Sequence, residues 1–77
     1  MRHEVQLPSP GNIWKVLVSV GSEVQAGDTL LIMEVMKMEV PVDSPVNGQV
    51  TEVLVNPGDE GLDANHPAIV IEGADNG

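Results

Sequence analysis

The stretch Gly11-Asn-Ile-Trp-Lys-Val-Leu-Val18 recurs 37 residues later as Gly48-Gln-Val-Thr-Glu-Val-Leu-Val55. Both copies begin with glycine and carry apolar residues at corresponding places, among them Ile13 and Val50, Val16 and Val53, and Val18 and Val55. Each copy then continues to another glycine at the same distance, Gly21 in the first and Gly58 in the second. Self-similarity at a fixed offset predicts that one supersecondary unit occurs twice.

A second pair of matching segments shows that the repeat includes almost the whole chain. Leu30-Leu-Ile-Met-Glu34 matches Ala68-Ile-Val-Ile-Glu72 at an offset of 38, because the second copy holds one extra residue. The two units therefore extend over about residues 11–34 and 48–72.

The composition favours short strands over helices. Thirteen valines and four isoleucines, against one tryptophan and no phenylalanine or tyrosine, suit pleated strands and form helices poorly. Leu30 to Val35 is apolar except for Glu34 and has no charged face at helical spacing, so we expect a buried strand there. The other strands are expected near Val5–Leu7, Gly11–Val20, Val24, Val40–Val42, Gly48–Val55 and Ala68–Glu72. Turns are expected at Gly21-Ser22, Ala26-Gly27-Asp28, Asn47-Gly48 and Asn56-Pro57-Gly58, and the core is expected to include Val16, Val18, Val53 and Val55.

Neither unit can bury its apolar face alone, so the sequence predicts one all-β domain over residues 1–77, with its core at about 7–72. The expected architecture is a flattened barrel-sandwich of two small antiparallel sheets with a pseudo-two-fold internal repeat. The connection between the units, roughly Val35 to Asn47, then has the two chain termini as its symmetry counterpart. We therefore expect the termini together at one end and the mid-chain hairpin at the other.

Charge and composition narrow the functional classes. Twelve acidic against three basic residues give a net charge of −9, which argues against nucleic acid and anionic membranes as partners. The absence of cysteine excludes disulfides and thiolate metal sites. No apolar run approaches the roughly 20 residues of a membrane span. The first residues lack the apolar segment of a signal peptide, so a cytoplasmic location is predicted.

Lys37 is one of two lysines and lies in the middle connection, where the repeat predicts an exposed tip. The surrounding Glu34-Val-Met-Lys-Met-Glu39 resembles the attachment signature of the biotinyl-domain family, Glu-Ala-Met-Lys-Met-Glu, whose central lysine carries biotin. Val35 in place of alanine is a small apolar change. The resemblance extends from about Leu7 to Glu72 and looks most like short, free-standing bacterial attachment proteins. It departs at Asn65, which replaces a turn glycine but tolerates a left-handed backbone.

This resemblance implies a biotin carboxyl carrier domain with covalent biotin on Lys37. It implies recognition roles for Met36, Met38, Glu34, Val35 and Glu39. Its expected partners are a biotin ligase and the biotin carboxylase and carboxyltransferase components of a carboxylase or decarboxylase system. The domain is expected to be monomeric and non-catalytic, with the ligase supplying the activated acyl group, because a charged amine is no nucleophile.

Two other functions remain open beside this one. Lipoyl domains share the fold, although they usually flank the lysine with aspartate and a small residue. A second alternative is an unmodified interaction domain. Met36 and Met38 are interpreted as recognition residues, with capping of the core as the alternative.

The remaining candidate residues favour structural roles. His3 and His66 are far apart in sequence without carboxylates at ligand spacing, so no metal site is expected. The serines lack a partnering histidine and carboxylate, which argues against a nucleophilic enzyme. Trp14 is expected to be a half-buried packing residue, with docking as the alternative.

Overall fold

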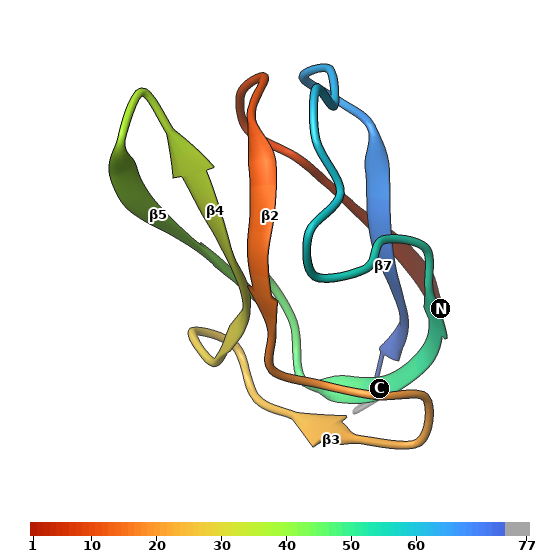
Figure 1. The fold of residues 1–77 in the computed structure, drawn as a ribbon. Coiled ribbons are helices and arrows are strands. Elements are labelled where there is room, and N and C mark those ends of the chain that lie inside the picture. Colours follow the sequence, from red (N-terminus) through yellow and green to blue (C-terminus); the bar gives the residue numbers. More distant parts are fainter. Residues whose placement is uncertain (74–77) are drawn as a thin grey trace.

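The computed structural model describes residues 1–73 as seven strands in two antiparallel sheets, which confirms the predicted all-β class (Figure 1). The strands are β1 (Arg2–Gln6), β2 (Asn12–Val16), β3 (Glu23–Val24), β4 (Thr29–Val35), β5 (Met38–Asp43), β6 (Gly48–Val53) and β7 (Pro67–Gly73). Within this range no helix is long and apolar enough to cross a membrane. The last four residues of the predicted 1–77 domain lie outside the described residues.

The sheet order reproduces the internal repeat. One sheet has the order β2-β4-β5 and the other β1-β7-β6-β3. The first sheet therefore matches the β6-β7-β1 part of the second, with the N-terminal strand completing the second unit. Even the irregularities correspond, because the β2–β4 and β6–β7 ladders are each interrupted at the same place, after Ile13 and after Val50. The predicted pseudo-two-fold arrangement is thus confirmed.

Strands β2 and β6 are shorter than predicted, ending at Val16 rather than Val20 and at Val53 rather than Val55. After each strand the chain leaves its own sheet and joins the opposite one. There it forms backbone hydrogen bonds with the first strand of the other unit, so each unit completes the sheet of its partner. The bonds are Gly21 N to Val50 O, Val50 N to Ser22 O, Gly58 N to Ile13 O and Ile13 N to Asp59 O, all 2.8 Å long.

These crossings change which valines form the core. Val55 is buried as predicted, but Val16, Val18 and Val53 are only half-buried at its margin, so their prediction as core residues is wrong. They lie where the strands end and the chain turns away, which opens one side of each residue to solvent. The residues that are almost fully buried come mainly from β4 in one sheet and β7 in the other: Leu30, Leu31, Met33, Ala68, Ile69, Val70 and Ile71.

The N-terminus and the last described residue lie side by side. Gly73 N donates to Met1 O at 2.7 Å, and the N-terminal ammonium group pairs with Glu72 Oε1 at 2.7 Å. Strand β1 therefore begins at Arg2, earlier than the predicted Val5. The β4–β5 hairpin projects on the other side of the molecule, as the symmetry argument predicts (Figure 1).

The turn at Asn65 uses the left-handed backbone that the sequence predicted. Its φ is 68°, and Gly27, at the same place in the first unit, has a φ of 94°. The backbone nitrogens donate in the same way, Gly27 to Ser44 O and Asn65 to Leu7 O, each at 2.8 Å. The extra residue of the second unit is therefore absorbed before this turn without disturbing its geometry.

Candidate functional site

The hairpin formed by β4 and β5 carries the residues singled out in the sequence. Its ladder extends from the pair Thr29–Asp43 to the pair Val35–Met38, next to the tip. The base is held by Leu30, Leu31 and Met33 of β4, whose side chains have no solvent exposure. The tip is therefore the end of a firmly anchored two-stranded arm.

Met36 and Lys37 form the two-residue turn between these strands. Their φ angles are 51° and 66°, so both adopt the left-handed conformation of a type I′ hairpin. Such turns usually contain asparagine or glycine, because a left-handed backbone costs other residues about 1–2 kcal/mol each. A turn that has methionine and lysine at these two strained positions, in place of glycine or asparagine, is typical of a functional site.

Both methionines beside Lys37 point to solvent. The exposed fraction is 90% for Met36 and 67% for Met38, so capping of the core by these side chains is wrong. Val35 differs, because it is half-buried and packs against the core. The hairpin thus anchors the apolar neighbour and leaves the thioethers available for contact.

Glu34 and Glu39 lie directly opposite each other across the two strands, just below the turn. Like charges in this position are destabilising. Neither they nor Lys37 form an ion pair within residues 1–73, where the two ion pairs join the N-terminus to Glu72 and Arg2 to Glu52. The structure therefore brings all six predicted residues together at the tip and presents the Lys37 amine to solvent.

The strain at the turn gives a measurable prediction. We expect Lys37→Gly to be more stable than Lys37→Ala by roughly 0.5–1 kcal/mol, since glycine adopts the left-handed conformation freely but loses more entropy on folding. Both variants lose the amine, so the comparison isolates the backbone. Thermal melts should differ by roughly 2–8 °C. Equal melting temperatures would show that the turn is unstrained.

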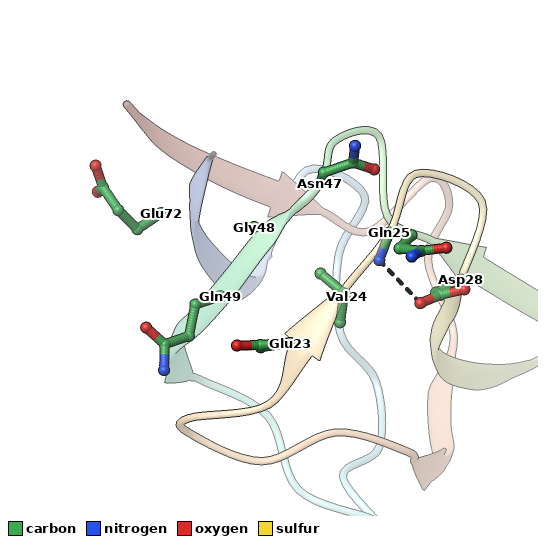
Figure 2. A pocket seen from close by; sticks show the side chains of 8 residues that line it. All are labelled: Glu23, Val24, Gln25, Asp28, Asn47, Gly48, Gln49 and Glu72. Atoms are coloured by element: carbon green, nitrogen blue, oxygen red, sulfur yellow. Dashed lines mark hydrogen bonds between the residues drawn. The ribbon is translucent and has the colours of Figure 1, made fainter. Parts of the chain in front are cut away.

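A surface hollow lies far from this turn. It has a volume of about 550 Å³ and lies between β3 and the beginning of β6, with Glu72 at its margin beside the N-terminus (Figure 2). Three carboxylates, Glu23, Asp28 and Glu72, line it. Within the described part of the chain, no three His, Cys, Asp or Glu residues are grouped to hold a metal ion. No pattern in the sequence indicated this hollow, because its lining comes from segments that only the crossing connections bring together.

A smaller hollow of about 140 Å³ occupies the equivalent place in the other unit, beside Trp14, Glu34 and Glu60. Trp14 is 43% exposed, more than predicted, and Lys15 Nζ lies 4.4 Å from its ring centroid. The irregularity between Ile13 and Lys15 in the ladder explains this exposure, because a bulge turns a side chain out of the regular alternation.

An anchored arm that offers one exposed amine at its tip, away from the larger of the two hollows, defines a carrier-type domain. Comparison with known proteins supports this assignment to a carrier-type domain. A family model described as "Biotin-requiring enzyme" matches residues 3–71. The chain belongs to this biotin/lipoyl attachment family and is a domain of the biotin carboxyl carrier type, a carrier and not a catalyst.

Relatives of very different length share this domain. The Biotin/lipoyl attachment protein of Bacillus subtilis is 40% identical over 55 residues, covering 71% of this chain and 75% of that protein. The mitochondrial methylcrotonoyl-CoA carboxylase subunit alpha of Dictyostelium discoideum is 39% identical over 64 residues, which are 83% of this chain and 9% of the subunit. A single-chain, multi-domain long-chain acyl-CoA carboxylase superposes with a TM-score of 0.87 at 26% identity, over 96% of this chain and 7% of that structure. The chain therefore spans less than a tenth of these carboxylases.

Proposed function

We propose that Lys37 carries biotin in an amide bond to its Nζ atom. The observation that supports this most directly is the two-residue turn, which exposes Lys37 between Met36 and Met38 in a chain related to carboxylases. In this role the anchored hairpin positions the amine, and the long flexible arm of the modified lysine moves the cofactor. Covalent tethering keeps the reactive group at high effective concentration near two successive active sites.

The modification requires an external catalyst in this proposal. A biotin ligase would supply an activated acyl group, and the neutral Lys37 amine would attack its carbonyl carbon, losing a proton and expelling the leaving group. An exposed lysine is charged near neutral pH, so the ligase must also promote deprotonation. Met36, Met38, Glu34, Val35 and Glu39 would form the surface that the ligase recognises.

The proposed assembly has three kinds of partner: the ligase, a biotin carboxylase and a carboxyltransferase. Carboxylate would be loaded on biotin at one active site and delivered at the other. We also propose that the domain is monomeric and works in the cytoplasm.

Intact mass spectrometry tests the identity of the cofactor. The unmodified protein would be incubated in parallel with biotin, ATP and a biotin ligase, and with lipoate, ATP and a lipoate ligase. We expect one biotinyl group and no lipoyl group. Amide formation removes one positive charge and changes the formal net charge from −9 to −10, so isoelectric focusing should show a more acidic product. Lipoylation alone would identify a lipoyl carrier, and no product with either ligase would favour an interaction domain.

The methionines give a further prediction about recognition. Since Met36 and Met38 are exposed, replacing either with alanine should change the free energy of unfolding by less than about 0.5 kcal/mol. Ligase-catalysed labelling, or later carboxylation, should instead become slower. Val55→Ala, at a residue that is 1% exposed, should cost roughly 1–3 kcal/mol, and the half-buried Val53→Ala less.

Thermal melts beside labelling time courses would separate these effects. Methionine variants that melt as low as Val55→Ala but label and carboxylate at the normal rate would contradict a recognition role.

A further inference from the structure

The four methionines of the chain differ sharply in their access to solvent. Met36 is 90% exposed and Met38 67%, whereas Met33, three residues before the turn, has no solvent exposure. Met1 is 77% exposed but lies at the terminal end of the molecule, paired through its ammonium group with Glu72. Two accessible thioethers therefore flank the acceptor lysine, and a third, inaccessible one lies in the same hairpin.

Solvent access matters because the thioether sulfur is open to oxidation. Hydrogen peroxide transfers one oxygen atom to the sulfur, which loses two electrons, while the O–O bond breaks and water leaves. The product, methionine sulfoxide, replaces a flexible apolar side chain with a polar and chiral one. Methionine sulfoxide reductases reverse the change, one enzyme for each epimer.

We infer that Met36 and Met38 form a reversible peroxide-responsive modification site that controls how fast Lys37 accepts its acyl group. The inference rests on the proposed function of Lys37. The turn is suited to this control because Met36 directly precedes Lys37 within it and Met38 begins β5 directly after it, so an exposed thioether lies on each side of the amine. A partner surface that receives apolar side chains on both sides of Lys37 would have to desolvate two sulfoxide oxygens instead.

The burial of Met33 confines the effect to recognition. Its side chain packs among Leu30, Leu31 and other core residues, so oxidation there would disrupt the fold. Oxidation at the exposed turn removes no core contact. Mild peroxide treatment should therefore slow labelling without lowering the melting temperature.

The experiment treats the unmodified protein with hydrogen peroxide, removes the peroxide with catalase, and then measures labelling by biotin ligase. Peptide mapping follows the oxidation of each methionine. We expect sulfoxide at Met36 and Met38 before Met33, and a fall in labelling rate of about fivefold to tenfold, as for an uncompensated polar group in an apolar contact. Treatment with both reductases should restore the original rate. The Met36→Leu/Met38→Leu double variant should lose the response to peroxide while keeping Met1 and Met33.

Oxidised protein that labels at the original rate would overturn the inference, and so would Met33 oxidising in parallel with the turn. A peroxide effect that persists in the double variant would have the same consequence. If leucine at these positions itself prevents labelling, rescue of the oxidised natural protein by the reductases decides the question. Failure of the unoxidised protein to accept biotin at Lys37 would instead contradict the proposed function, and this inference with it.

Discussion

Replacement of Lys37 with arginine is expected to abolish biotinylation completely while leaving the fold intact. Arginine keeps the positive charge and a long flexible side chain, but its guanidinium group stays protonated and cannot attack the activated acyl group. The residue is exposed at a turn, so the free energy of unfolding should change by less than about 0.5 kcal/mol. Intact mass after incubation with ligase, biotin and ATP measures the first effect, and a thermal melt the second.

Lys15→Arg is the matched control, because Lys15 is the other lysine of the chain and is also exposed. It lies on β2, beside Trp14, and should remain without effect on labelling. Biotin attached to the Lys37→Arg protein, or found on a peptide that contains Lys15 of the natural chain, would contradict the assignment of Lys37 as the acceptor.

Replacement of Ile69 with alanine is expected to cost roughly 2–5 kcal/mol of folding free energy. Ile69 has no solvent exposure and lies on β7, where it pairs with Val5 of β1 and Val53 of β6. A chain of this length has a total stability of about 4–12 kcal/mol, so the variant should melt at least about 8 °C lower or be partly unfolded.

Leu54→Ala removes a similar side chain from a position that is 43% exposed and should cost much less. Denaturant unfolding followed by circular dichroism compares the two variants. An equal loss of stability would show that the core does not lie on β7. Labelling of Lys37 should fall in Ile69→Ala only to the extent that the protein is unfolded.

The sequence by itself determined the class of fold and the place of Lys37 at the tip of the middle hairpin. The offset between Gly11 and Gly48 predicted two equivalent units, and the chain's midpoint therefore had to lie opposite its termini. The prediction held because the two units have the same local pattern, and symmetry then follows from burying both apolar faces together. Asn65 could likewise be assigned a left-handed turn from its residue type and its place in the repeat.

The tertiary structure alone decided where each strand ends and which side chains are covered. Val16 and Val53 continue the apolar pattern of their strands, yet the chain leaves its sheet there to bond with the other unit. Alternation of apolar and polar residues predicts which side chains face inward. The residue at which the chain leaves one sheet for the other depends instead on hydrogen bonds between residues about 30 or more positions apart. The exposure of Trp14 and the left-handed conformation of Met36 also depend on the tertiary structure and not on residue type. A bulge and a two-residue turn are set by how neighbouring strands pair, and no local preference of tryptophan or methionine encodes either.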